Sequence, residues 1–147
     1  MTMELVCKRF EELTLGELYE ILRCRCEVFA MEQKILYQDM DGKDMTSTHL
    51  FYTVEGRIVS YLRIIDAGVK YPEVSIGRVL TLKDYRHRGI SRRLMEEAIA
   101  HIRSRTDAPI RIEAQSYLKE FYESIGFRAV SGEFILEGIP HISMLYS

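Results

Sequence analysis

The segment Arg86–Ser91, with the sequence Arg-His-Arg-Gly-Ile-Ser, constrains the fold of this chain more than any other stretch. The apolar run Ser75–Leu82 ahead of it predicts a strand. Behind it, apolar residues recur at the spacing of a helix: Leu94, Ala98, Ile99 and Ile102. A strand that enters a helix through a basic turn containing glycine brings free backbone N–H groups to the positive end of the helix dipole. The pattern predicts an anion site, whose most common ligand is a phosphate or pyrophosphate.

Each part of this turn has a role in that interpretation. Gly89 lets the backbone approach the ligand, and Ser91 keeps the first helical turn uncluttered. The side chains of Arg86, His87 and Arg88 add positive charge. The alternative is a basic helix start on a solvated surface. The chain has no Gly-x-x-x-x-Gly-Lys-Ser/Thr and no Gly-x-Gly-x-x-Gly after an early strand, which argues against a P-loop and a Rossmann unit.

The composition excludes several classes of protein. A length of 147 residues predicts one domain, and a net charge of −2 gives no electrostatic case for nucleic acid. No apolar run approaches the ~18 residues that a membrane helix needs. Charged residues at Glu4, Lys8 and Arg9 interrupt any signal-peptide core. We therefore expect a cytoplasmic protein without a membrane partner.

The possible metal ligands do not form a site in the sequence. Cys24 and Cys26 would lie about 200° apart around a helix, so they could not share a metal ion on one face. The predicted role of the three cysteines is packing. The four histidines show no ligand spacing. The segment that begins at Asp39 resembles the start of a calcium loop, but it has Asp44 and Leu50 where such a loop needs Gly and Glu. The sequence predicts no metal site.

The remaining patterns predict an α/β domain. Its first half contains, in order, a strand over Glu4–Phe10, a helix from the capping box Thr14–Glu17 to about Ala30, an irregular segment Met31–Thr48, a hairpin of Leu50–Val54 and Ile58–Ile65, and a strand Val74–Leu82. Its second half contains a helix over 89–103, a strand over Pro109–Ala114, a helix that Ser116 caps and that ends at Ile125, and closing strands Phe127–Leu136 and Ile139–Tyr146. The helix over 89–103 would cross between two parallel strands after an antiparallel meander.

Several motifs carry a family resemblance. Arg86-x-x-Gly89-x-Ser91 resembles the Gln/Arg-x-x-Gly-x-Gly/Ala signature of the GCN5-related N-acetyltransferases (GNAT), with serine where the family usually has glycine or alanine. Phe121–Phe127 is similar to the family's Tyr-x-x-x-Gly-Phe block. Three further stretches resemble the bacterial ElaA-like branch: Val28–Gln33, Tyr37–Gly42 and Gly138–Ile142. The resemblance implies one GNAT domain over 1–147, with a mixed, mostly antiparallel sheet flanked by helices (α+β).

The resemblance also implies a cosubstrate and the residues that bind it. The cosubstrate is acetyl-coenzyme A, with its pyrophosphate held by Arg86, His87, Arg88, Gly89, Ile90 and Ser91. The backbone of Val79, Leu80 and Thr81 would bind the pantetheine arm, since this strand splays from the next one in the family. Tyr122 would protonate the departing thiolate. The helix alone instead favours a core tyrosine, because an apolar stripe lies beside it.

The implied activity is transfer of an acetyl group to a primary amine of a small molecule or a peptide. A non-catalytic acyl-coenzyme A-binding module is the alternative, and a homodimer is left open. The general base is undetermined: the candidates are Glu32, Gln33, Tyr37, Glu113, Gln115, His141 or water. Neither nucleic acid nor a membrane is an expected partner.

Overall fold

The first half of the sheet is an antiparallel meander. The computed structural model describes residues 2–147. Its first strands are β1 (Glu4–Arg9), β2 (Thr48–Val54), β3 (Arg57–Ile65) and β4 (Val74–Thr81). Each pairs antiparallel with the next, and the Glu55–Gly56 turn has positive φ at both residues, as a tight hairpin requires. The predicted hairpin is therefore confirmed.

The second half consists of β5 (Ile110–Gln115), β6 (Phe127–Ala129), β7 (Phe134–Leu136) and β8 (Ile139–Tyr146). The order across the sheet is β1-β2-β3-β4-β5-β8-β6, and β7 also pairs with β8. Only β4 and β5 run parallel among the paired strands of residues 2–147. The mixed, mostly antiparallel sheet of the expected fold is confirmed.

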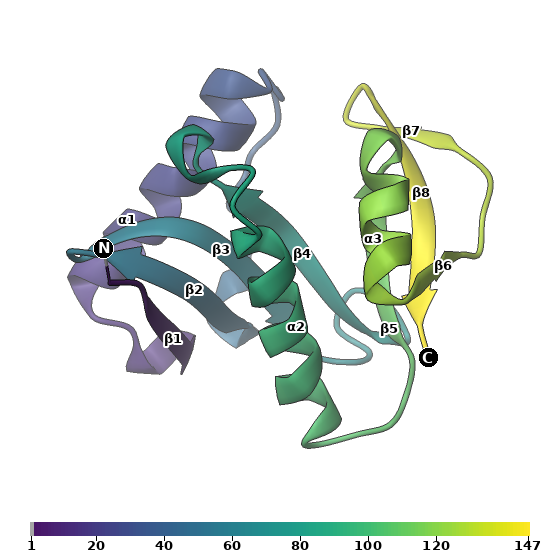
Figure 1. Cartoon of the computed structure of the whole chain (residues 1–147), viewed down its shortest axis with the longest axis horizontal. Helices are drawn as coiled ribbons and strands as arrows, with labels where there is room; N and C mark the ends of the chain where they lie inside the picture. Colours follow the sequence, from purple (N-terminus) through teal and green to yellow (C-terminus); the bar gives the residue numbers. More distant parts are fainter. Residues whose placement is uncertain (1) are drawn as a thin grey trace.

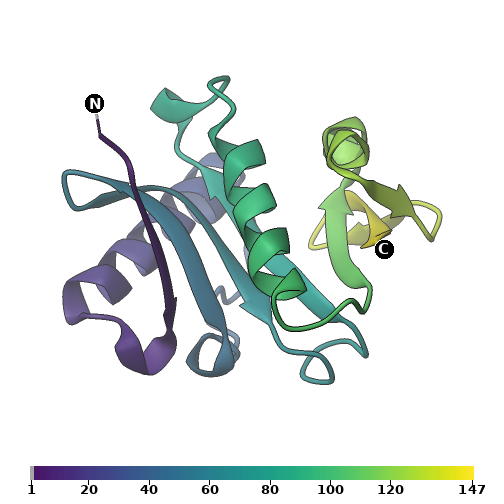
Figure 2. The same cartoon turned by 60° about the horizontal axis from the view of Figure 1, so that its bottom comes forward.

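The two halves are joined by very little pairing. Strands β4 and β5 pair only through Val74 with Ile110 and Ser75 with Arg111, and then diverge (Figures 1 and 2). Within β4, the register against β3 shifts beside Arg78, whose φ is +53°. A β-bulge of this kind adds to the bend of β4 near Arg78. The sheet is consequently split along its middle.

Helices cover both faces of the sheet. The helix α1 (Leu15–Arg25) begins at the predicted capping box, in which Thr14 and Glu17 exchange bonds of 3.0 and 2.8 Å. It continues as a π-helix over Cys26–Glu32. The α1 face of the sheet contributes Phe51, Tyr61 and Leu80 to one core, and α2 (Ile90–Arg103) packs on the opposite face. The helix α3 (Lys119–Ile125) lies over the second half of the sheet (Figure 1). No helix of residues 2–147 is long and apolar enough to cross a membrane.

Three local predictions were wrong. Phe127–Leu136 is not one strand, because the chain leaves the ladder after Ala129 and the Ser131 hydroxyl accepts the N–H of Ser143 at 2.9 Å instead. Ser116 does not cap a helix, since it starts a 3₁₀ turn and its hydroxyl is buried without a partner in residues 2–147. Packing explains only Cys24 among the cysteines, because Cys7 and Cys26 are exposed.

The irregular segment between the π-helix and β2 is held by ion pairs. Three arginines from α1, β3 and β4 meet three aspartates of this segment, and we call this set the Arg–Asp network: Arg25, Arg63, Arg78, Asp39, Asp41 and Asp44. The N–O distances of these five ion pairs run from 2.6 to 3.0 Å. Charge-assisted bonds of this kind replace the missing backbone ladder of a loop. The segment is thereby fixed against the sheet.

Candidate functional site

A cavity of about 790 Å³ occupies the place where β4 and β5 diverge. Neighbouring residues of a strand point to opposite faces of a sheet. Because Ile112 and Glu113 both line the cavity, it reaches both faces. Ser91 and Tyr122 line it on the side of α2 and α3, and His141 lines it on the side of Glu113. A cavity through a split sheet lets two molecules approach one point from opposite sides.

The turn before α2 has the geometry of an anion site. Gly89 precedes the helix with φ +75° and ψ 11°, and no side chain caps the helix start. The first bond of α2 runs from the Arg93 N–H to the Gly89 carbonyl at 3.1 Å, so the earlier N–H groups have no acceptor within the helix. A Cβ atom built on Gly89 would meet no atom within 4 Å. The backbone is therefore open to a ligand.

The structure brings five of the six predicted turn residues to the cavity wall: Arg86, His87, Gly89, Ile90 and Ser91. The sixth, Arg88, places its guanidinium 5.4 Å from the ring centre of Tyr85. The backbone segment Val79–Thr81 also lines the cavity, as expected for the end of β4. The turn before α2 and the end of β4 therefore line the same cavity.

The side chain of Arg86 is held by two partners. Its Nη atoms donate to both carboxylate oxygens of Glu32 at 2.5 and 2.7 Å, and its Nε donates to the Thr81 carbonyl at 2.9 Å. The hydrogen bonds from Arg86 lower the pKa of Glu32. The pair ties the end of the π-helix to the turn, so Arg86 shares its charge with Glu32 rather than presenting it freely.

Ser91 uses its hydroxyl in a chain of bonds under the turn. The Ser91 Oγ lies 2.5 Å from Thr81 Oγ1, which lies 2.8 Å from Ser60 Oγ. Ser60 also donates to the Leu80 carbonyl at 3.0 Å. The serine that departs from the usual glycine or alanine therefore joins the start of α2 to β4 and β3.

Tyr122 is a buried residue on the cavity wall. It is 5 % exposed, and its ring lies edge-on to Phe121 and Phe127 at 5.1 and 5.9 Å. It also lines the cavity, and its hydroxyl makes no hydrogen bond to any of residues 2–147. Burial raises the pKa of the Tyr122 hydroxyl, so the group keeps its proton. A protonated, uncommitted hydroxyl facing a cavity is suited to donate a proton.

The other polar groups of the cavity differ in how far they are engaged. Glu113 accepts from Arg111 at 2.8 Å and from Ser143 at 2.6 Å, and the Gln115 amide donates to Gln33 at 3.1 Å. Burial raises the pKa of Tyr37. His141 donates from Nδ1 to the Ile139 carbonyl, and its Nε2 makes no hydrogen bond within residues 2–147.

Sequence reasoning missed several residues that line the cavity, among them Arg63, Lys70 and Tyr71 on the Glu113 side. Arg63 had one local signal, because it is the charged residue of the otherwise apolar end of a strand. Lys70 and Tyr71 lie in the turn between β3 and β4, and nothing in their local pattern indicates a site. Their position depends on the pairing of β4 with β5.

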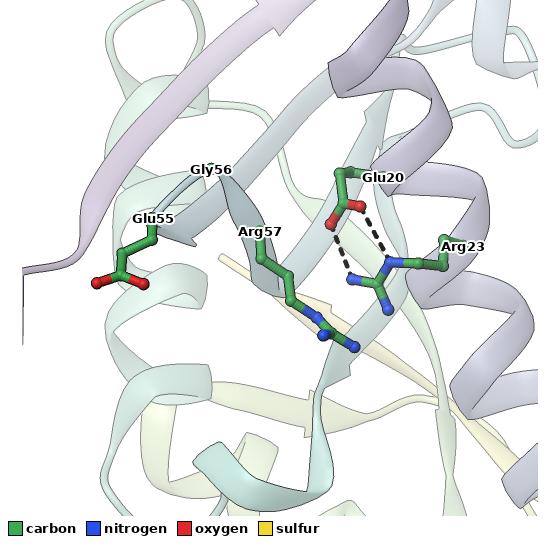
Figure 3. A pocket seen from close by; sticks show the side chains of 5 residues that line it. All are labelled: Glu20, Arg23, Glu55, Gly56 and Arg57. Carbon is green, nitrogen blue, oxygen red and sulfur yellow. Dashed lines mark hydrogen bonds and ion pairs between the residues drawn. The ribbon is translucent and has the colours of Figure 1, made fainter.

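A second, smaller hollow lies away from the split in the sheet, between α1 and the β2–β3 hairpin (Figure 3). Its lining is Glu20, Arg23, Glu55, Gly56 and Arg57. Arg23 donates to both carboxylate oxygens of Glu20, at 2.8 and 3.1 Å. Glu20 and Arg23 therefore satisfy one another, and the larger cavity is the candidate site. Residues 2–147 contain no group of three or more side chains that could hold a metal ion.

Comparison with known proteins agrees with this geometry. The family model for the acetyltransferase (GNAT) domain matches residues 17–147. The chain belongs to the GNAT family. Within it, the chain is 35 % identical to protein ElaA of Escherichia coli over 136 residues, which cover 90 % of this chain and 89 % of ElaA. This GNAT protein therefore falls in the ElaA-like branch, and its motifs in Val28–Gly42 and Gly138–Ile142 agree with that position.

Solved structures confirm the fold of this GNAT protein. The crystal structure of E. coli ElaA superposes with a TM-score of 0.93 and covers 99 % of this chain and 100 % of that one. An acyl-CoA N-acyltransferase from Pseudomonas aeruginosa gives the same TM-score and coverage at 38 % identity. A UPF0039 protein of Synechocystis is 39 % identical, over 95 % of this chain and 92 % of that protein. The acyl-CoA N-acyltransferase fold is thus shared over the whole length.

Proposed function

We propose that this protein transfers an acetyl group from acetyl-coenzyme A to a primary amine of a small molecule or a peptide. The observation that carries the proposal is the cavity through the split sheet, with the open N-terminus of α2 at Gly89 on its wall. When bound, acetyl-coenzyme A supplies an activated thioester. The protein then needs mainly to place and deprotonate the amine. One face of the split would admit the cosubstrate and the other the amine.

The residues of the turn and of β4 divide the binding between them. The pyrophosphate would accept from the first N–H groups of α2, next to Gly89, with charge from Arg86, His87 and Arg88. The pantetheine arm would follow the backbone of Val79–Thr81 along the diverging edge of β4. The carbonyls of Leu80 and Thr81 already accept from Ser60 and Arg86, which favours backbone N–H groups as the contacts.

Tyr122 would give its hydroxyl proton to the departing sulfur. Replacing it with phenylalanine keeps the aromatic packing and removes only the donor. We expect Tyr122→Phe to lower kcat toward the low end of the ~10²–10⁴-fold range of general acid catalysis, with coenzyme A affinity nearly unchanged. Tyr52→Phe is the matched control, because Tyr52 is a buried tyrosine outside the cavity lining. Equal kcat in Tyr122→Phe and wild-type protein would leave Tyr122 a core residue.

The decisive experiment combines binding with turnover. Coenzyme A should raise the melting temperature, because a ligand of the native state shifts unfolding, whereas ATP serves as the control anion. A panel of primary amines and peptides is then screened with acetyl-coenzyme A, and longer acyl-coenzyme A thioesters test the donor. Binding without turnover of any amine would instead support the non-catalytic module. No melting shift at millimolar coenzyme A would contradict both.

We place this reaction in the cytoplasm, in a protein whose single domain spans 1–147. The three cysteines are free thiols in the structure, which agrees with a reducing compartment. Light scattering of the purified chain tests for the homodimer.

A further inference from the structure

We propose that His141 is the general base that takes the proton from the acceptor amine, directly or through one water molecule. The inference rests on the proposed function and assigns a role that the family resemblance left undetermined. It follows from how the His141 ring is held, from where it lies in the cavity, and from how its competitors are engaged.

The ring of His141 is fixed in one tautomer. Its Nδ1 lies 2.7 Å from the Ile139 carbonyl, and a carbonyl oxygen only accepts, so Nδ1 carries the hydrogen. The neutral ring therefore has its lone pair on Nε2, which makes no hydrogen bond within residues 2–147. Phe134 stacks on the ring, with 6.2 Å between centres and 27° between planes. The bond and the stacking together hold a basic nitrogen in a set direction.

His141 lies on the Glu113 face of the split, opposite α2 and α3, and this is the face that we assign to the amine. In the sheet, His141 lies opposite Gln115, the last residue of β5, where the distance from β4 has opened. Its side chain shares a face with Glu113 and Gln115, whereas Tyr122 approaches from the α3 side. An amine between them would meet a proton acceptor on one side and, beyond the acyl carbon, a proton donor on the other.

The other candidates are less suited to accept a proton. Glu32 is paired with Arg86, and both oxygens of Glu113 accept hydrogen bonds. Tyr37 packs under the Arg78 guanidinium at 5.3 Å and keeps its proton near neutral pH, because burial raises its pKa. The side-chain amides of Gln33 and Gln115 are not bases. Among the side chains that the sequence left as candidates, His141 is the one with an uncommitted basic nitrogen within residues 2–147.

His49 shows the opposite arrangement in the same sheet. Its Nε2 donates to the Asp44 carbonyl at 2.8 Å, and its Nδ1 lies 2.7 Å from the Tyr61 hydroxyl. Burial lowers the pKa of His49, so the ring is neutral and Nδ1 accepts from Tyr61. Both of its nitrogens are engaged, and it does not line the cavity. This histidine is structural and provides an internal reference.

The proposed step balances as follows. His141 Nε2 takes one proton from the ammonium group and passes it to solvent. The nitrogen of the neutral amine then forms a bond to the acyl carbon, and the carbon–sulfur bond of the thioester breaks. The sulfur takes the proton of Tyr122, and the second proton lost by the nitrogen restores the tyrosine. The products are the amide, the free thiol of coenzyme A and one proton in solvent.

The first test needs no acceptor. Nitrogen-15 NMR of the histidine rings at pH 8, with signals assigned by His141→Asn and His49→Asn, distinguishes the two tautomers. We expect the Nδ1–H form for His141 and the Nε2–H form for His49. An Nε2–H form of His141 would overturn the proposal, because the nitrogen that faces the amine would then carry a hydrogen.

The second test measures turnover of acetyl-coenzyme A with the best amine from the screen. We expect His141→Ala to lose about 10²–10⁴-fold in kcat/KM and to recover activity with added imidazole. Coenzyme A should still raise its melting temperature, and the control His101→Ala, on the far part of α2, should match wild-type protein.

The outcomes separate the two proposals. Unchanged kcat/KM in His141→Ala, or a loss that imidazole does not restore, would reject the base and leave the transferase of the active wild-type protein intact. Loss of the coenzyme A shift in His141→Ala would show a structural role and reject the base as well. Wild-type protein that binds coenzyme A and acetylates no amine would contradict the proposed function itself.

Discussion

The Arg–Asp network and the split between β4 and β5 meet at β4 and differ in how their polar groups are paired. In the network, Arg25 and Arg63 are 0 and 1 % exposed, and each is matched by two carboxylates. In the split, the helix start at Gly89 and the Tyr122 hydroxyl lack partners among residues 2–147. A folded chain satisfies its buried polar groups almost everywhere.

The difference separates the residues that stabilise the fold from the groups that are left free to bind a ligand. The network fixes one wall of the cavity, because its aspartates belong to the segment that contributes Tyr37 and its arginines belong to α1, β3 and β4. The split keeps donors free for a ligand. Changes in the network should therefore affect stability first, and changes in the split should affect binding first.

The largest effect should come from breaking the network. Arg25→Met leaves Asp39 and Asp44 with fewer partners, and removing one member of a buried pair costs about 3–5 kcal/mol of unfolding free energy. Urea unfolding measures the loss. Arg57→Met is the control, since the 60 % exposed Arg57 pairs with Glu27 only at 3.7 Å and should contribute under ~1 kcal/mol. Equal losses in both variants would remove the distinction between network and surface.

An intermediate effect is expected at the turn. Gly89→Val places a β-branched side chain at φ +75° and in the space left for the ligand, so coenzyme A should bind at least about tenfold more weakly, or ~1.4 kcal/mol. Gly56→Val is matched, because Gly56 has φ +81° with open space around it and lies in the β2–β3 turn. Both should lose similar stability, and only Gly89→Val should lose affinity by calorimetry. Normal affinity in Gly89→Val would exclude this turn as the phosphate site.

The smallest effect should come from Ser91→Ala. The change removes the bond to Thr81 and leaves a residue that the family accepts at this position, so about 1 kcal/mol of unfolding free energy should be lost. Coenzyme A affinity should stay within about twofold of wild-type protein, since a change of 1.4 kcal/mol is needed for tenfold. A large loss of affinity would show that the Ser91 hydroxyl, rather than the backbone, contacts the cosubstrate.

Features with local causes could be predicted from the sequence. The capping box at Thr14, the Glu55–Gly56 hairpin and the turn at Gly89 each depend on residues within a few positions of one another. The family resemblance predicted that β4 splays away from β5. The two strands pair at only two positions, which confirms this prediction.

Features that depend on distant partners could not be predicted. Arg63 meets Asp41 across 22 residues, and Arg78 meets Asp39 across 39, so no window of sequence contains either pair. The break in Phe127–Leu136 depends on Ser131 reaching Ser143 of β8. The stacking of Phe134 on the His141 ring depends on the pairing of β7 with β8.

The π-helix over Cys26–Glu32 sets a limit on how this chain can change in length. Its wider turns, such as the bond from Gln33 N–H to the Val28 carbonyl at 2.9 Å, hold one residue more than an α-helix would. Deleting one residue there would let the π-helix close into an α-helix with the flanking residues in place, whereas a second deletion would turn everything that follows by about 100° around the helix axis, because an α-helix has 3.6 residues per turn. Glu32 would then point away from Arg86. We therefore expect insertions and deletions among relatives to lie beyond Gln33 rather than within this stretch of helix.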